Sequence, residues 1–144
     1  MSKSMFFRTV NGAVNLVASE TVLYDEQANI LLVLGKGCSL LRYDNSDKAE
    51  DLFKQLKGKV KPEPKQCIKM ENGGFINIEA IKDIRLSEKS GSLLVSGTND
   101  KLLHIFDAEH HTNLEGLRDV LVDGLISAND GKAMPKVDWA LYHA

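Results

Sequence analysis

The chain consists largely of short apolar runs separated by turn residues, and two of these runs differ in an informative way. Residues 30–34 read Ile-Leu-Leu-Val-Leu, whereas residues 92–96 read Ser-Leu-Leu-Val-Ser. A strand covered on both faces reads as a continuous apolar run, and a strand covered on one face alternates with polar residues. The sequence therefore predicts one strand that is buried on both sides and a related strand that is buried on one side.

Eight further segments have the length and composition of strands. They are 6–10, 13–16, 21–25 and 39–44 in the first part of the chain and 67–72, 75–78, 82–87 and 101–107 in the second. Asn11-Gly12 and Gly73-Gly74 are strong signals for tight turns, so each set should begin with a hairpin. Counting the short early segments loosely, we expect four antiparallel strands in each set.

Two segments carry the apolar spacing of amphipathic helices. Apolar residues stand at 49, 52, 53 and 56 in the first segment and at 114, 117, 121 and 125 in the second, which gives each helix one apolar stripe. Asp47 with Glu50, and Thr112 with Glu115, have the spacing of capping boxes and are expected to begin the two helices. Each set of strands is therefore followed by one helix.

The two sets are related by an internal repeat with an offset of 62 residues. Residues 13–41 align without a gap on residues 75–103, and nine of the 29 pairs are identical, where chance would give about two. We therefore predict an α+β fold with an internally duplicated ββββα-ββββα layout. It would have two antiparallel sheets, each with one helix, related by a pseudo-two-fold axis around a single shared core.

This layout also predicts the domain organisation. A half of about 62 residues buries too little surface to be stable alone, so residues 1–144 should form a single domain. Repeat 1 covers 5–58 and repeat 2 covers 66–128, with a proline- and lysine-containing linker at 59–65 and a C-terminal tail at 129–144.

Composition excludes several classes of protein. No apolar run approaches the length of about 20 residues that a membrane span needs, and the N-terminus lacks the pattern of a signal peptide, so we expect a cytoplasmic protein without membrane association. Cys38 and Cys67 are 29 residues apart and have no CxxC spacing, which argues against a disulfide framework and a zinc module. His110-His111, beside Asp107, is expected in a solvated loop. We therefore predict no catalytic residues, no metal, no cofactor and no enzymatic activity.

In its topology, the tandem ββββα arrangement resembles the Whirly and PUR-repeat families over nearly the whole chain. In these families two sheets and two helices form a platform for single-stranded nucleic acid, so the resemblance implies binding of single-stranded DNA or RNA on the sheet surface. A second, local pattern runs from the Asn11-Gly12 turn through the strands of the first set to residues 49–56. It is similar to small FlbD-type flagellar-operon proteins and implies an interaction module without enzymatic activity.

The charge distribution suggests which residues would contact phosphates. Residues 1–62 carry nine Lys and Arg against seven Asp and Glu, a net charge of +2, whereas residues 63–144 carry nine against 13, a net charge of −4. The predicted phosphate contacts are Arg8, Lys36, Arg42, Lys54, Lys57, Lys59 and Lys61. The predicted stacking residues are Phe6, Phe7 and Tyr43.

The apolar run at 30–34 predicts an interface. Leu31 and Val33 share one face of the strand and should lie under the helix, which leaves Ile30, Leu32 and Leu34 on the other face. We expect that face to be covered by another subunit or by the tail that carries Trp139, the one tryptophan. The expected partners are other copies of the chain, with single-stranded nucleic acid or a protein as the further partner. A phage- or flagellar-type assembly or regulatory role without nucleic acid is the alternative function, and the number of subunits stays open.

Overall fold

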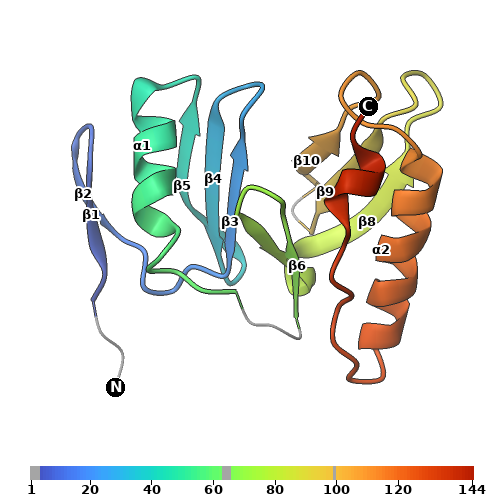
Figure 1. Cartoon of the computed structure of the whole chain (residues 1–144). Helices are drawn as coiled ribbons and strands as arrows, with labels where there is room; N and C mark the ends of the chain where they lie inside the picture. Colours follow the sequence, from blue (N-terminus) through green and yellow to red (C-terminus); the bar gives the residue numbers. More distant parts are fainter. Residues whose placement is uncertain (1–3, 63–65, 99) are drawn as a thin grey trace.

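The computed structural model describes residues 4–62, 66–98 and 100–144 and has an α+β fold (Figure 1). The first half contains β1 (Phe6–Thr9), β2 (Gly12–Asn15), β3 (Thr21–Asp25), β4 (Ile30–Gly35), β5 (Cys38–Asp44) and α1 (Asp47–Leu56). The second half contains β6 (Cys67–Lys69), β7 (Phe75–Asn77), the 3-10 turn η1 (Ile78–Ala80), β8 (Ile81–Leu86), β9 (Leu93–Gly97), β10 (Leu102–Phe106), α2 (Leu114–Ala128) and the 3-10 turn η2 (Trp139–Tyr142).

The strands form three sheets where two were predicted. β1 and β2 make a two-stranded sheet, β10-β9-β8 make a three-stranded sheet, and β5-β4-β3-β7-β6 make a five-stranded sheet. The hairpin β6–β7 therefore leaves the other strands of its own half and pairs with β3, where Val22 lies opposite Phe75. The expected separation into one sheet for each half is wrong because this hairpin crosses from the second half to the first.

Residues 62 positions apart are paired alike in the two halves. Val22 lies opposite Val33 in the β3–β4 ladder, and Ile84 lies opposite Val95 in the β8–β9 ladder. The β4–β5 and β9–β10 ladders each contain one irregularity at a corresponding point. These strands therefore share their register between the two halves, whereas the two opening hairpins are placed differently.

The helices begin one residue away from the predicted caps. Ser46 has an extended backbone and its hydroxyl accepts the Lys48 N–H at 3.2 Å, so Ser46 is the N-cap of α1 and Asp47 already belongs to the first turn. Asn113 precedes α2 in the left-handed conformation, with φ of 51°, and its side chain makes no cap. Both capping-box assignments are therefore wrong, although both helices exist as expected.

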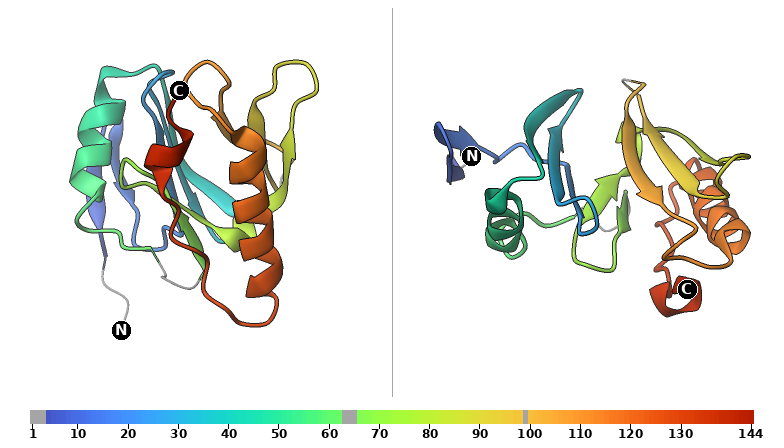
Figure 2. Two further views of the ribbon diagram at one scale, coloured as in Figure 1. Left: turned by 45° about the vertical axis from the view of Figure 1, so that its right-hand side comes forward. Right: turned by 90° about the horizontal axis from the view of Figure 1, so that it is seen from above.

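The buried apolar side chains form two clusters, not the single core that was predicted. α1 lies between the β1–β2 hairpin and the five-stranded sheet, and α2 lies at the opposite side of the molecule (Figure 2). Leu31 and Val33 belong to the cluster beneath α1, as predicted. Leu32 and Leu34 belong to the other cluster, together with Leu103 of β10. Each cluster contains residues from both halves, so the halves depend on each other for burial. No helix among the described residues is long and apolar enough to cross a membrane.

Candidate functional site: a cleft between the two halves

The residues predicted to bind nucleic acid are spread over β1, the five-stranded sheet, α1 and the segment after α1. Arg42 stands opposite Leu32 on β5, on the face away from α1, and forms an ion pair with Asp44 at 2.9 Å. Lys54 lies on α1 itself, where it pairs with Glu50 at 2.9 Å. The remaining predicted contacts are exposed at Arg8 on β1, Lys36 in the β4–β5 turn, and Lys57, Lys59 and Lys61 after α1. The predicted set does not form one continuous surface.

The predicted stacking residues are mostly engaged within the chain. Phe7 is 4% exposed, and Lys59 Nζ lies 5.3 Å from the centre of its ring. Tyr43 is half-buried, and its hydroxyl oxygen accepts the Val10 N–H at 3.2 Å. Phe6 is 64% exposed and is the one member of the three with a free ring surface.

The predicted interface residues are covered by the chain itself. Leu32 and Leu34 are each 8% exposed, and Ile30 is half-buried. The second half supplies the cover that we expected from another subunit, so the burial of this face needs no partner. Trp139 stacks on Phe106 with ring centres 5.6 Å apart, and its Nε1–H donates to the Lys69 carbonyl oxygen at 3.1 Å.

A cleft of about 540 Å³ lies where the two halves meet. Its lining comes from the β3–β4 turn, the β6–β7 turn, the end of β10 with the following loop, and the C-terminal tail. The aromatic side chains of Tyr24, Phe106 and Trp139 form its apolar part. Because these segments lie far apart in the sequence, the cleft exists only when both halves have folded together.

The charged groups of the cleft are acidic or histidine. Four carboxylates line it, at Asp25, Glu26, Glu71 and Asp107, together with all four histidines of the sequence, His104, His110, His111 and His143. No lysine or arginine is among the lining residues. The cleft therefore carries a negative potential when its histidines are neutral.

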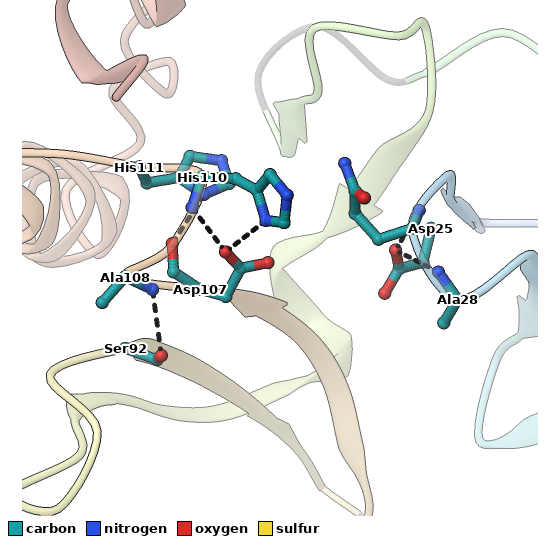
Figure 3. Close-up of polar contacts among 8 residues, drawn as sticks. Asp25, Ala28, Ser92, Asp107, Ala108, His110 and His111 are labelled. Atoms are coloured by element: carbon teal, nitrogen blue, oxygen red, sulfur yellow. Dashed lines mark hydrogen bonds and ion pairs between the residues drawn. The ribbon is translucent and has the colours of Figure 1, made fainter.

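Hydrogen bonds hold the Asp107 side of the cleft in place. The Asp107 carboxylate accepts the backbone N–H of His110 at 2.7 Å and lies 2.7 Å from His110 Nδ1 (Figure 3). His111 Nδ1 lies 3.0 Å from the Asp107 carbonyl oxygen. Burial alone raises the pKa of Asp107, but the backbone and ring groups of His110 outweigh it and leave that pKa below its ordinary value.

The opposite side of the cleft is built by two turns. The Asp25 carboxylate accepts the N–H groups of Gln27 and Ala28, at 2.9 and 3.2 Å, and so closes the β3–β4 turn (Figure 3). Asn72 joins the second turn to the first, because its Nδ2–H donates to the Tyr24 carbonyl oxygen at 2.8 Å. Across the β6–β7 turn, Glu71 Oε1 lies 2.8 Å from His143 Nε2, which ties the C-terminus to the same side.

His104 is the residue of the cleft whose acidity is most perturbed. Burial lowers its pKa from 6.5 to about 4, since an imidazolium ion would lose its hydration there. The ring packs edge-on against Phe106, with centres 4.6 Å apart. His104 is therefore neutral at physiological pH and contributes to the apolar part of the cleft.

Only one part of this cleft could be recognised from the sequence. The His110-His111 pair beside Asp107 was noticed, and His110 is exposed as expected, but the opposing Asp25, Glu71 and His143 were missed. No spacing in the sequence connects these three residues, because they come together only when hairpin β6–β7 pairs with β3 and the C-terminal tail packs beside it. Among the described residues, no group of His, Cys, Asp and Glu is arranged to hold a metal ion.

Comparisons of the chain with protein-family models, with curated proteins and with solved structures found no match. The resemblances in topology and in the first-half pattern therefore stay predictions.

Proposed function

We propose that the protein is a non-enzymatic interaction protein that binds a basic, partly apolar segment of a partner protein in the cleft. The observation that carries this proposal is the lining, in which four carboxylates and three aromatic rings occur without a lysine or arginine. Complementary charge gives an interface its specificity and its association rate. A lysine or arginine side chain over the Trp139 ring would add a cation–π contact.

The size of the cleft agrees with this kind of ligand. Its volume of about 540 Å³ falls within the range of pockets that bury small ligands or a few side chains. Its walls are fixed by the hydrogen bonds of Asp107, Asp25 and Asn72, so little ordering is needed on binding. A short extended segment with one or two basic residues fits these properties.

Trp139 provides a direct test, since it is the one tryptophan of the chain and lines the cleft. We would titrate the protein with a Lys- and Arg-rich peptide and follow Trp139 fluorescence. Glu71→Gln should weaken binding by roughly two- to fivefold, the usual effect of one exposed charge. Asp123→Asn is the matched control, because it removes one negative charge from an exposed position of α2.

The expected result is a saturable fluorescence change that an acidic peptide of equal length does not produce. Equal weakening by Glu71→Gln and Asp123→Asn would show that only the net charge matters, and the cleft would then not be the binding site. No fluorescence change with any basic peptide would also contradict the proposal.

Single-stranded nucleic acid is the second candidate ligand. The exposed lysines after α1 favour it, because Lys57, Lys59 and Lys61 follow each other beside the β1–β2 hairpin that exposes Phe6. Anisotropy of a labelled oligonucleotide at about 50 and about 200 mM salt tests this, since phosphate contacts weaken steeply with salt. Absence of binding at the lower salt concentration would remove this candidate and leave the cleft proposal untouched.

We also propose that the two halves are copies of one ββββα unit. The equal register of β3–β4 and β8–β9, at an offset of 62 residues, supports this. A duplicated unit normally places its elements alike around a pseudo-two-fold axis. The two hairpins depart from this symmetry, because β6–β7 joins the five-stranded sheet and β1–β2 forms a sheet of its own.

A further inference from the structure

The outer edges of the equivalent strands β3 and β8 are used differently. β3 is flanked by β4 on one side and by the hairpin β6–β7 on the other, whereas β8 is the edge strand of its sheet. No strand among the described residues pairs with the outer edge of β8. α2 packs against β8, but a strand edge without a partner strand is a template for pairing with another chain.

The hairpin β1–β2 has the same internal construction as β6–β7. Leu16 N–H donates to the Met5 carbonyl oxygen at 2.8 Å, as Ile78 N–H donates to that of Gln66 at 2.8 Å. Each hairpin also ends in an asparagine whose side-chain oxygen accepts the N–H two residues later. These bonds measure 3.2 Å at Asn15 and 2.9 Å at Asn77. The two hairpins are thus built to the same plan, but only the second is docked on a sheet.

One hydrogen bond docks the hairpin β6–β7 on β3, and the equivalent hydrogen bond at β8 is not formed within the chain. Thr21 Oγ1 accepts the buried backbone N–H of Asn77 at 3.0 Å. The residues 62 positions away are Asp83 and Asn15. Asp83 Oδ1 is buried without a hydrogen-bond partner, although it forms a longer ion pair with Arg85 Nη1 at 3.5 Å. Buried polar atoms normally have a hydrogen-bond partner, so Asp83 Oδ1 has room for a hydrogen-bond donor at the position where the repeat would supply one, although the side chain as a whole is 39% exposed.

The backbone of β2 is able to supply that donor. Amide groups of neighbouring residues in a strand point to opposite edges. Since Leu16 N–H points toward β1, Asn15 N–H points to the outer edge of β2. Gly12 also corresponds to Gly74, where a Cβ atom would lie 2.8 Å from the Val22 carbonyl oxygen. Both features that let β7 approach β3 are therefore present in β2.

The β1–β2 hairpin of the same chain does not lie near the outer edge of β8. It lies beside α1, whereas β8 lies with α2 on the other side (Figure 1). In this position Phe6 and Val10 are each 64% exposed, while Cys67, which lies opposite Asn77 as Phe6 lies opposite Asn15, is 3% exposed. A second copy of the chain is therefore the occupant that matches the β8 edge in sequence, register and hydrogen bonding.

We propose that the β1–β2 hairpin of a second copy adds to the β8 edge in antiparallel orientation. Ala13 lies opposite Ile84 in this arrangement, and Asn15 N–H donates to the Asp83 carboxylate. The exchange is reciprocal, which closes a two-fold dimer. The proposal is independent of the cleft, since it uses no residue that lines it.

Cross-linking between two chains, each with one introduced cysteine and the buried native Cys67, tests the pairing. One chain carries Ala13→Cys and the other Ile84→Cys, both with Cys38→Ser to remove the exposed native thiol. Opposed residues of an antiparallel pair are close enough for a disulfide. We expect oxidation of the mixture to give a covalent heterodimer and each chain alone to give little product. Arg85→Cys, one residue out of register, is the matched control that should not cross-link.

A chain that carries both cysteines distinguishes the two sources of the hairpin. A disulfide within one monomer would show that the chain's own hairpin reaches β8, and it would overturn the proposal of a second copy. Absence of any cross-link in the mixture would overturn it as well.

Asp83 offers a second measurement that does not require cysteines. Asp83→Thr reproduces the residue at position 21. Asp83→Val has nearly the shape of the threonine variant but lacks its hydroxyl acceptor. We expect light scattering to give similar dimer dissociation constants for the wild type and the threonine variant. The valine variant should dissociate at least roughly fivefold more readily, because each dimer loses two hydrogen bonds. Equal dissociation of the threonine and valine variants would contradict the proposed contact.

Discussion

His104 should make the stability of the fold depend on pH in the mildly acidic range. In the folded chain, burial lowers the pKa of His104 from 6.5 to about 4. The unfolded chain binds a proton at this residue near pH 6.5, and the folded chain does not. Protonation therefore favours unfolding. The stabilising contribution of neutral His104 is complete above about pH 6.5, falls as the pH is lowered, and reaches its minimum below about pH 4.

The size of this effect follows from the separation of the two pKa values. Each pH unit between them is worth about 1.4 kcal/mol of unfolding free energy. The loss is therefore about 2 kcal/mol at about pH 5 and about 3 kcal/mol once the folded chain is also protonated. Such a loss is a large fraction of the stability of an ordinary domain.

Urea unfolding followed by Trp139 fluorescence measures this directly. Wild type and His104→Gln are compared at about pH 7.5 and about pH 5, and the difference between the two pH dependences isolates His104 from the other titrating groups. We expect the variant to lose about 2 kcal/mol less than the wild type on acidification. His110→Gln, at an exposed histidine, is the control. Equal pH dependence in wild type and His104→Gln would refute burial of a neutral imidazole at this site.

Three further substitutions test separate contacts by urea unfolding. Thr21→Val leaves the buried Asn77 N–H without its acceptor and should cost about 1–3 kcal/mol, whereas Thr21→Ser should retain most of the stability. Ser46→Ala removes the cap of α1 and should cost about 1 kcal/mol, with Ser46→Asp close to wild type. Gly124→Ala places a Cβ atom 2.5 Å from Pro135 Cδ, which should cost about 1–3 kcal/mol and speed proteolysis of the tail.

Each of these expectations has a clear contrary result. Equal stability of the serine and valine variants at position 21 would mean that the hydroxyl is not the acceptor that docks β7. An unchanged Ser46→Ala chain would place the start of α1 elsewhere. Normal stability and proteolysis of Gly124→Ala would show that the tail does not pack on α2 as described.

Local chemistry made most of the secondary structure predictable. The Asn11-Gly12 and Gly73-Gly74 signals gave the two hairpins, and the apolar stripe of residues 49–56 gave α1 with its buried face. Leu31 and Val33 also face α1 as their alternation predicted. The caps failed because several polar residues stand together at 45–47, and spacing alone does not decide which side chain meets the first free amide.

The assembly of the halves was not predictable in the same way. The sequence of hairpin β6–β7 does not indicate which strand the hairpin will pair with, because β3 and β8 both have an edge that could accept it. The serines at 92 and 96 predicted a strand that is buried on one side, but Ser92 is 7% exposed and Leu94 and Ser96 are half-buried, so that face of β9 is partly covered as well. The cleft could not be predicted from the sequence. Asp25, Glu71 and His143 come together only because hairpin β6–β7 pairs with β3 and the C-terminal tail folds back onto the cleft.

The pairing of hairpin β6–β7 with β3 also has a consequence for folding during synthesis. Residues up to Leu56 contain β1 to β5 and α1, but one edge of β3 has no partner strand until residues 67–77 have been synthesised. At ordinary rates of translation, the delay between the end of α1 and the end of β7 is roughly one to four seconds. During that interval a nascent chain offers an unpaired strand to its neighbours on the same messenger RNA. Faster or slower translation of this short stretch would therefore change how much of the protein reaches the folded state.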